Sequence, residues 1–389
     1  MDNRKKIIFS CYDDLKNPFY GGGGAYAIHE IAKRLAKKHD VKVLTGNYKG
    51  AISEIIDGVN YKRIGVSRSG ARSGQLIYQI LLPYYVMKED FDIWFENFTP
   101  PFSINFLPLF TKKPVIGIAN LLAAKDMSKK YWGIPFHLVE KFGLHFYKNV
   151  IVLTKYLKQK LESEYLNMNV FEIPNAVDEK YVTFKVTKKT GDYILYLGRI
   201  DIRQKGLDLL LSAYKIVEDK INLKLIIAGD GPVEEINTLK ESIAAMNLKN
   251  KVMLTGWVAG EKKVKLLKNA AFMVLPSRFE EFGIVVLESF CFETPVISFD
   301  LPQLSWIPDE GVIKVECENT NKLAYEMLKM SNDKKSRETM GKKAKKNVFK
   351  YRWVASAKLY SNVINKVIDE NINYSDFSVS KSETSSSSL

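Results

Sequence analysis

The sequence predicts an α/β protein made of two domains of similar size, each with a parallel sheet covered by helices. Short β-rich runs alternate with apolar residues at helical spacing, as in residues 6–10 followed by residues 25–38. This alternation begins afresh after the turn-rich residues 173–178 and the lysine-rich residues 185–192. Two independent series of β-α units indicate two Rossmann-like domains with a cleft between them.

Each half of the chain supplies its own set of expected elements. In the first half we expect strands at residues 6–10, 41–45, 91–96, 114–118 and 150–153, and helices at residues 25–38 and 155–165. In the second half we expect strands at residues 193–197, 223–228, 252–254, 272–275 and 296–299, and a helix at residues 207–218. The predicted domains are residues 1–180 and 190–350, followed by a helix at residues 351–370 that packs back on the first domain and a disordered serine-rich tail at residues 375–389.

The charge balance favours anionic partners. The 389 residues include 58 lysines and arginines against 44 acidic residues, a formal net charge of +14. Such a surface attracts nucleic acid, anionic lipid headgroups or phosphorylated small molecules, and composition does not choose among them. Three widely spaced cysteines and four scattered histidines exclude a disulfide scaffold, a zinc ribbon and a multi-histidine metal centre.

The longest apolar stretches are too short for a leader or a membrane span. The run near the start, residues 7–9, falls below the about 7–15 apolar residues of a signal peptide. Residues 97–111 carry three prolines and fall below the about 20 residues of a spanning helix. We therefore expect a cytoplasmic protein with a peripheral contact to the anionic inner face of the membrane.

A glycine and two cations follow the expected strand at residues 193–197. Gly198 and Arg199 come directly after this strand, and Lys205 precedes the next helix. Glycine lets a phosphate approach the backbone, and two charge-assisted hydrogen bonds of about 1.5–3 kcal/mol each would hold a diphosphate. Two surface cations beside a turn are the plainer interpretation of the same residues.

Two glutamates flank a second loop. Glu280, Phe282 and Gly283 lie between the strand at residues 272–275 and a helix that begins near Gly283, and Glu288 lies inside that helix. Free amides at a helix start suit an anion, whereas carboxylates suit hydroxyl groups. The alternative is a helix start decorated with acids that complement its dipole.

Five segments in order give a resemblance to a known family. Gly198-Arg199 with Lys205-Gly206, and Glu280 with Glu288, resemble the paired motifs of the retaining glycosyltransferases of family 4. Three more segments are similar to the family's G-x-G-P turn, its P-N-G-V-D segment and its amino-terminal glycine pair, namely residues 228–232, residues 173–178 and Gly22-Gly23. The resemblance covers about residues 6–365. It implies a GT-B architecture, in which two facing Rossmann-like domains hold a nucleotide sugar mainly on the second.

The resemblance also implies roles for the motif residues. Arg199 and Lys205 would bind the donor diphosphate and stabilise the charge that develops as it leaves, without a metal or another cofactor. Glu288 would bind the ribose hydroxyls and Glu280 the sugar hydroxyls. The other donor contacts are expected at Gly22, Gly23, Gly198, Phe282 and Gly283. Retention comes with the family, through a front-face reaction in which the departing phosphate oxygen takes the acceptor's proton.

One position departs from the family pattern. Many relatives carry a histidine after the strand that corresponds to residues 114–118, whereas this chain has Asn120 there. Asn120 is able to donate a hydrogen bond to a sugar hydroxyl but not to take a proton. His137 is a second candidate for a sugar or acceptor contact, with packing beside Pro135 and Phe136 as the alternative.

Other segments match motifs less well. Asp90 and Asp92 fit the D-x-D of a different, manganese-binding glycosyltransferase fold, but they open a strand far in sequence from the diphosphate motifs. Residues 22–27 fit the dinucleotide fingerprint, yet a long loop separates them from the first strand. The apolar residues 96–110 are explained by core packing, or by a groove for a lipid-linked acceptor or a membrane. Basic residues of the same domain that would meet anionic headgroups are Arg63, Arg68, Arg72 and Lys88.

These patterns predict a metal-independent, retaining glycosyltransferase that moves a hexose from a UDP- or GDP-linked donor to a glycan or lipid-linked acceptor. Replacing the exposed cation Lys205 by alanine should impair turnover with little effect on folding. A sugar-nucleotide epimerase or hydrolase of the same fold is one alternative. Another is a basic nucleic-acid-binding protein without catalysis, although the cations are spread along the chain.

Overall fold

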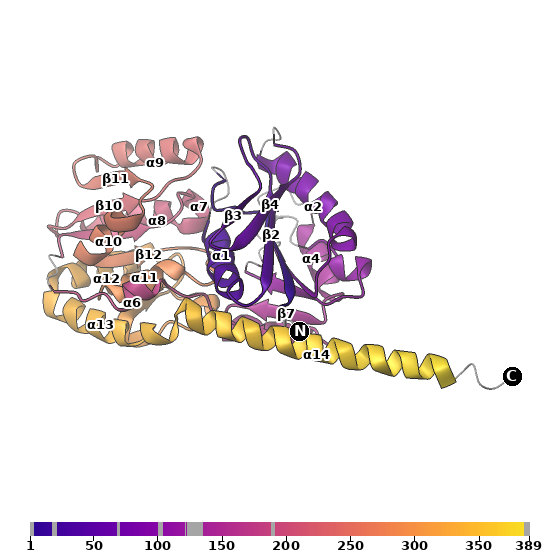
Figure 1. Cartoon of the computed structure of the whole chain (residues 1–389). Coiled ribbons are helices and arrows are strands. Elements are labelled where there is room, and N and C mark those ends of the chain that lie inside the picture. Colours follow the sequence, from indigo (N-terminus) through magenta and orange to yellow (C-terminus); the bar gives the residue numbers. More distant parts are fainter. Residues whose placement is uncertain are drawn as a thin grey trace. The chain divides into compact units, whose positions relative to one another are not determined.

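The computed structural model describes residues 4–17, 22–67, 71–99, 104–120, 122, 135–187 and 191–384. The chain divides into two compact units, Met1–Asn175 with Trp353–Leu389, and Ala176–Arg352 (Figure 1). Each unit contains one sheet whose central strands are parallel, as the alternation of strands and helices predicts.

The first unit contains an eight-stranded sheet in the order β3-β4-β2-β1-β5-β6-β7-β8. Its strands are β1 (Lys6–Ser10), β2 (Asp40–Gly46), β3 (Glu54–Ile56), β4 (Val59–Ile64), β5 (Ile93–Asn97), β6 (Val115–Ala119), β7 (Asn149–Val152) and β8 (Asn169–Glu172). The central strands β5, β6 and β7 are buried along their whole length, because helices cover both faces of a parallel sheet. The edge pair β3 and β4 is antiparallel and is not expected from the sequence pattern.

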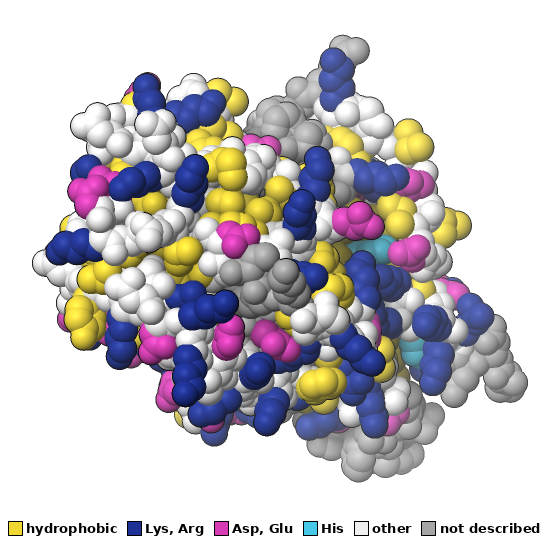
Figure 2. Space-filling model, turned by 90° about the vertical axis from the view of Figure 1, so that its left-hand side faces the viewer, with side chains coloured by type: hydrophobic (Ala, Val, Ile, Leu, Met, Phe, Trp, Pro, Cys, Tyr) yellow, Lys and Arg dark blue, Asp and Glu magenta, His cyan; other side chains and the backbone are white. Residues whose placement is uncertain are grey.

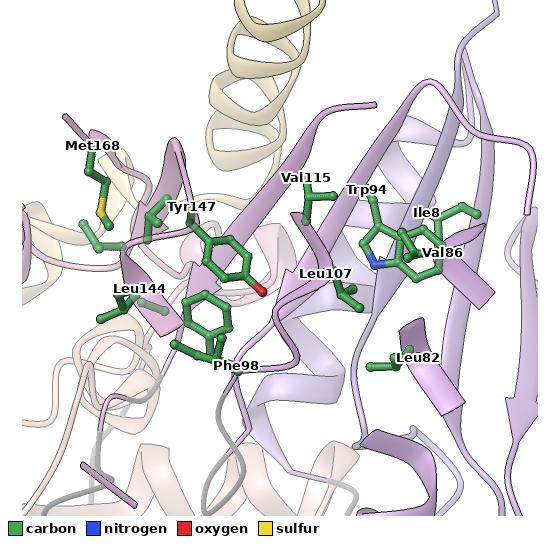
Figure 3. Packing of buried hydrophobic residues seen from close by; sticks show 14 of the residues in the cluster. Ile8, Leu82, Val86, Trp94, Phe98, Leu107, Val115, Leu144, Tyr147 and Met168 are labelled. Carbon is green, nitrogen blue, oxygen red and sulfur yellow. The ribbon is translucent and has the colours of Figure 1, made fainter. Parts of the chain in front are cut away.

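One face of this sheet is covered by α2 (Ala71–Lys88), η1 (Leu107–Phe110), α4 (Phe136–Leu144) and α5 (Lys155–Glu164). Buried residues of these elements and of the strands form one apolar cluster. Figure 3 shows Leu82 and Leu107 on the side of Trp94, and Leu144 beside Phe98 and Tyr147. Phe98, Ile104 and Leu107 belong to this cluster, so core packing accounts for these three residues of the tract at residues 96–110, whereas Leu109 and Phe110 are exposed.

The opposite face carries α1 (Gly23–Leu35) and α14 (Trp353–Thr384), which contact each other. Ile8 belongs to the cluster on the first face, whereas the ring of its neighbour Phe9 lies 6.2 Å from the ring of Tyr360 in α14. Side chains alternate between the faces of a strand, so this pair separates the two layers. The Ser356 hydroxyl donates to the Pro174 carbonyl at 2.8 Å, which ties the start of α14 to the first unit.

Two boundaries differ from the expected ones. The second unit begins at Ala176, before the lysine-rich stretch, because Val177 donates its amide to the Tyr351 carbonyl. Helix α14 continues to Thr384, through most of the tail predicted to be disordered; residues 385–389 lie outside the described residues. Extending an established helix adds one hydrogen bond per residue, which explains how polar residues continue it.

The second unit contains a six-stranded parallel sheet in the order β11-β10-β9-β12-β13-β14. Its strands are β9 (Tyr193–Leu197), β10 (Lys224–Ala228), β11 (Val252–Gly256), β12 (Ala270–Leu275), β13 (Val296–Phe299) and β14 (Val312–Val315). Its helices are α6 (Glu179–Val182), α7 (Ile202–Lys205), α8 (Leu207–Val217), α9 (Val233–Ala245), α10 (Gly260–Asn269), α11 (Ile284–Cys291), α12 (Thr320–Asn332) and α13 (Lys334–Lys346), with short 3-10 turns η2 (Pro302–Leu304), η3 (Asp309–Gly311) and η4 (Val348–Lys350). Counted along this unit, the strand order is the 3-2-1-4-5-6 of a doubly wound sheet, which reverses between β9 and β12.

Candidate active site

Both sequence motifs of the second unit lie at the point where the strand order reverses. The first motif loop, residues 198–206, follows β9, and the second motif loop, residues 276–283, follows β12. β9 and β12 are adjacent and parallel, so the two loops leave the same edge of the sheet. Ligands of doubly wound sheets bind at this edge, at the reversal of strand order.

Backbone contacts join the two motif loops. The Arg278 amide donates to the Gln204 carbonyl at 2.9 Å. Gly206 has a φ of +64°, and a Cβ at this position would lie 1.9 Å from the Pro276 carbonyl oxygen. Only glycine therefore permits both the left-handed backbone and this approach.

The side chain of Arg278 also anchors the second motif loop. Its guanidinium donates to both carboxylate oxygens of Asp208 at 2.8 Å, and to the Arg203 carbonyl at 2.9 Å. A bidentate arginine–carboxylate pair fixes geometry as well as charge. The sequence motif contains Arg278 but assigns it no role, because its partners come from elsewhere in the fold.

Lys205 and Glu280 form an ion pair that links the motif loops. The Lys205 Nζ lies 2.6 Å from the Glu280 Oε2, and the side chains are 16% and 15% exposed. The expectation that Lys205 is an exposed cation is therefore wrong, because the short helix α7 turns its side chain toward the second loop. Its positive charge is already held beside Glu280 before any ligand binds.

Arg199 remains available to solvent. Its side chain is 57% exposed, and its Nη2 donates to the Gln204 Oε1 at 2.6 Å. The Tyr196 hydroxyl donates to the Arg199 carbonyl at 2.7 Å and lies 3.1 Å from the position of a Cβ on Gly198. Burial raises the pKa of Tyr196, so this hydroxyl remains a donor. Tyr196 thus holds the backbone at Arg199, while the Arg199 guanidinium is exposed to solvent.

The G-x-G-P turn supports the first motif loop. The Gly198 amide donates to the Ala228 carbonyl at 3.0 Å, and the Ile200 amide donates to the Asp230 carbonyl at 2.8 Å. A Cβ at Gly231 would lie 2.2 Å from the Ile200 carbonyl oxygen. The glycine of this turn is therefore needed to bring the two chain segments together, whichever ligand binds.

The second motif loop ends at the start of α11. Gly283 is the N-cap residue, has a φ of +71°, and provides no side-chain cap for the helix amides. The Phe282 ring is stacked on Trp306 with centroids 4.5 Å apart, and the Trp306 Nε1 donates to the Phe282 carbonyl at 3.1 Å. Trp306 thus fixes the peptide unit predicted to contact the donor. No motif includes Trp306, and its role is not predicted from the sequence.

Glu288 lies on α11 with a lysine partner that the sequence does not indicate. The Lys263 Nζ, from α10, lies 2.5 Å from the Glu288 Oε1. The second oxygen, Oε2, is buried and has no hydrogen-bond partner among the described residues. A buried acceptor without a donor is costly, so this carboxylate retains the capacity to accept a hydrogen bond.

The amino-terminal glycine pair lies in the first unit, at the start of α1. Gly22 is the N-cap residue and Gly23 the first residue of the helix, and both are exposed. The first turn contains no acidic residue and the N-cap offers no side-chain hydrogen bond. The exposed amides of this 13-residue helix suit an anion.

Asn120 joins a polar cluster at the carboxyl ends of the first unit's strands. Its Nδ2 donates to the Asn97 Oδ1 at 2.5 Å, and Asn97 in turn donates to the Cys11 Sγ at 3.3 Å. Asn97 was not predicted as a site residue. His137 is exposed in the first turn of α4, so the packing interpretation does not describe it.

The two aspartates of the D-x-D segment bind neighbouring lysines at the surface. Asp90 binds the Lys6 Nζ at 2.5 Å and the Lys113 Nζ at 3.1 Å, and Asp92 accepts the Lys6 amide. In the part of the chain that the structure describes, no group of three or more His, Cys, Asp or Glu side chains is arranged to hold a metal ion.

A buried carboxyl group in β5 makes a pH-dependent contribution to stability. Glu96 accepts hydrogen bonds from the Tyr147 hydroxyl and from the Asn105 backbone and side-chain amides. Burial outweighs these bonds and raises the pKa of Glu96 from 4.5 to about 7. Between these two pH values the folded state binds a proton that the unfolded state has released, so stability falls as pH rises.

We expect Glu96→Gln to remove this loss. The free energy of unfolding of the wild type should fall by about 3 kcal/mol more than that of the variant between about pH 4.5 and pH 8. Urea unfolding at both ends of this range measures the difference. Equal losses in the two proteins would show that Glu96 does not titrate in this window.

Two family profiles match the chain. The profile of glycosyl transferases group 1 matches residues 178–347, which include both motif loops and Glu288. The profile of glycosyltransferase family 4 matches residues 21–181, which begin at the glycine pair. The chain belongs to the group 1, family 4 glycosyltransferases.

Two curated relatives from one archaeal organism align with this chain over part of their length. An uncharacterized glycosyltransferase of Methanocaldococcus jannaschii is 31% identical over 245 residues, which are 58% of this chain and 62% of the relative. A second one from the same organism is 29% identical over 222 residues, 54% of this chain and 59% of the relative. The chain thus spans about three fifths of the length of these two relatives.

Solved structures match nearly the whole glycosyltransferase chain. Sucrose-phosphate synthase from Thermosynechococcus elongatus has a TM-score of 0.78 at 18% identity and covers 94% of this chain and 100% of that one. Anabaena HepE, solved in complex with UDP and glucose, has a TM-score of 0.69 at 14% identity and covers 93% and 100%. These likenesses establish the GT-B fold that the sequence predicts.

Proposed function

We propose that this protein is a metal-independent, retaining glycosyltransferase that moves a hexose from a nucleotide-diphosphate sugar to an acceptor hydroxyl. The Lys205–Glu280 pair, with Arg199 on one of the same two adjoining loops at the reversal of strand order, carries the proposal. Positive charge on a glycine-containing edge suits a diphosphate, and a carboxylate beside it suits sugar hydroxyls.

The proposed step needs no protein nucleophile. The bond from the sugar's anomeric carbon to the diphosphate oxygen breaks, and the acceptor oxygen forms a new bond on the same face. The departing phosphate oxygen takes the acceptor's proton, so charge and atoms balance. Arg199 and Lys205 stabilise the charge that grows on the diphosphate, which takes the place of a metal ion.

The remaining residues orient the donor. Glu280 accepts hydrogen bonds from the sugar hydroxyls, and Glu288, with its unpartnered Oε2, accepts them from the ribose. The peptide units of Phe282 and Gly283 contact phosphate or sugar, beside the backbone of Gly198. In the first unit, the proposed donor contacts are Gly22 and Gly23. The proposed sugar or acceptor contacts are Asn120 and His137. The proposed reaction requires the donor substrate and no cofactor.

The donor is proposed to be linked to UDP or GDP, and the acceptor to be a glycan or a lipid-linked glycan. Anabaena HepE, which shares the fold, was solved with UDP and glucose, and this supports a nucleotide-sugar donor. The nucleic-acid alternative calls for one basic surface, whereas Figure 2 shows lysines and arginines spread over one face with acidic side chains among them.

The test is a transfer assay with two readouts, run in EDTA. Release of the nucleoside diphosphate is followed by chromatography with and without candidate glycan acceptors, and the anomeric configuration of the product is read by NMR. We expect acceptor-dependent release and an α-linked product from an α-linked donor. Release without an acceptor would favour the hydrolase, a changed sugar nucleotide the epimerase, and an inverted product would contradict retention.

A further inference from the structure

The outer side of one helical layer in the first unit is apolar where a layer that faces water is normally charged. On α2, exposed apolar side chains recur on one stripe, at Leu76, Ile80, Tyr84 and Met87. On η1 and α4, the exposed apolar side chains are Leu109, Phe110, Leu138, Val139 and Phe142. All nine are at least 41% exposed. We call these nine residues the apolar face.

The elements of the apolar face adjoin one another. α2 contacts η1, and the ring of Phe106, which caps η1, lies 6.3 Å from the ring of Phe142 in α4. Figure 1 shows α2 and α4 on the same side of the first unit's sheet. The inner sides of these elements join the buried cluster, so the apolar face is a second, outward surface.

Helix α5 of the same layer provides an internal comparison. Its inner residues Leu157 and Leu161 are buried, and its exposed residues include Lys155, Lys160 and Glu162. This is the pattern of a helix with one side in water. Helix α2, by contrast, contains no acidic residue along its 18 positions. The apolar outer side is therefore a property of α2, η1 and α4 and not of the layer as a whole, and such patches mark interaction sites.

Exposed lysines lie at the border of the apolar face, and the acids Glu89 and Asp90 beside it are paired with lysines. Glu89 binds Lys42 and Lys62, and Asp90 binds Lys6 and Lys113. Exposed lysines at the border are Lys88, Lys112 and Lys141, and no described acidic side chain forms an ion pair with them. Met87 and Phe110 line a hollow of about 440 Å³ together with three lysines, Lys88, Lys112 and Lys113, and with the lysine-paired acids Glu89 and Asp90. Apolar and cationic groups thus lie side by side.

One residue expected to meet headgroups, Arg63, does not contribute. Arg63 is buried, because its Nε donates to the Asp14 Oδ2 at 2.9 Å and its side chain is 2% exposed. Arg68 lies outside the described residues, and the side chain of Arg72 is not described. Among the predicted basic residues whose side chains the structure describes, Lys88 lies exposed at the border of the apolar face.

We propose that the apolar face binds the surface of an anionic lipid bilayer. Aromatic and aliphatic side chains would enter the headgroup region, and Lys88, Lys112 and Lys141 would meet anionic headgroups. A second copy of the chain fits less well, because a two-fold interface would bring the same cationic border onto itself. In the described part of the chain, no helix is long and apolar enough to cross a membrane.

The test is co-sedimentation of the full chain with vesicles, in the absence of any sugar nucleotide. We expect the wild type to bind vesicles of phosphatidylglycerol and phosphatidylcholine, to bind pure phosphatidylcholine more weakly, and to dissociate as salt rises. The double variant Ile80→Glu, Phe142→Glu should bind at least about tenfold more weakly. Lys112→Glu with Lys141→Glu should also weaken binding by about tenfold or more, and only to the anionic vesicles.

The matched control is Val233→Glu, at an exposed apolar residue of α9 in the second unit, which should bind as the wild type does. Thermal unfolding of all variants should be unchanged, because the replaced side chains are exposed. A wild type that does not bind anionic vesicles would overturn the proposal. So would sedimentation velocity showing a wild-type dimer that Ile80→Glu, Phe142→Glu converts to a monomer without vesicle binding. Because no donor is present, neither result depends on the proposed transfer reaction.

Discussion

Lys205→Ala should lower kcat by about 100-fold or more, the usual effect of removing one group that stabilises charge in a transition state. The Lys205 ammonium already lies 2.6 Å from Glu280 at the edge where the diphosphate is proposed to leave. Steady-state kinetics with the donor identified by binding measures the effect. Lys205→Arg should restore part of the rate, because it restores the charge.

Two controls separate this loss from a change in folding. Lys240→Ala, on the exposed side of α9, should leave kcat unchanged. The thermal midpoint of Lys205→Ala should fall but the variant should remain folded at the assay temperature, because Glu280 loses its partner in a largely buried pair. A variant with a normal kcat would show that Lys205 does not act on the diphosphate.

Gly206→Ala should destabilise the second unit by about 3 kcal/mol or more and abolish donor binding. The left-handed backbone at Gly206 costs an alanine about 1–2 kcal/mol, and the clash with the Pro276 carbonyl adds to this. Relief of the clash would separate the two motif loops. Urea unfolding and donor-induced thermal shifts measure the two consequences.

Gly256→Ala is the matched control for Gly206→Ala. Gly256 has a φ of +69°, close to the +64° of Gly206, but no atom lies within 4 Å of a Cβ built there. It should therefore lose only about 1 kcal/mol and keep donor binding. Equal losses in the two variants would mean that the close approach of the loops contributes nothing.

The central strands of both sheets are predicted from the sequence, because short continuous apolar runs between helical patterns indicate buried parallel strands. β1, β9 and β13 match the expected ranges. The edge strand β3 and its neighbour β4 were missed, since β3 is only three residues long and the apolar residues of β4 are interrupted by Asn60, Lys62 and Arg63. Helix α2 was missed as well, because its apolar residues lie on both sides and Pro83 interrupts the helical signal.

The candidate site is likewise predicted only in part from the sequence. Gly198, Lys205, Glu280 and Gly283 stand out in the sequence because their types and spacing suit phosphate and sugar binding. Their partners depend on the tertiary fold: Lys263 is 25 positions from Glu288, and Glu280 is 75 positions from Lys205. The exposure of Lys205 was misjudged for this reason.

The measurement that tests the central claim most directly is a thermal-shift panel of UDP, GDP, ADP and dTDP sugars in EDTA. It compares the wild type with Arg199→Ala, and with Arg203→Ala as a control in the same loop, where only the backbone carbonyl contacts Arg278. Donors of one base class should stabilise the wild type and Arg203→Ala, by about 2.7 kcal/mol at 100 times Kd, but not Arg199→Ala. No shift with any donor, or an equal shift in Arg199→Ala, would contradict a metal-free diphosphate site on these loops.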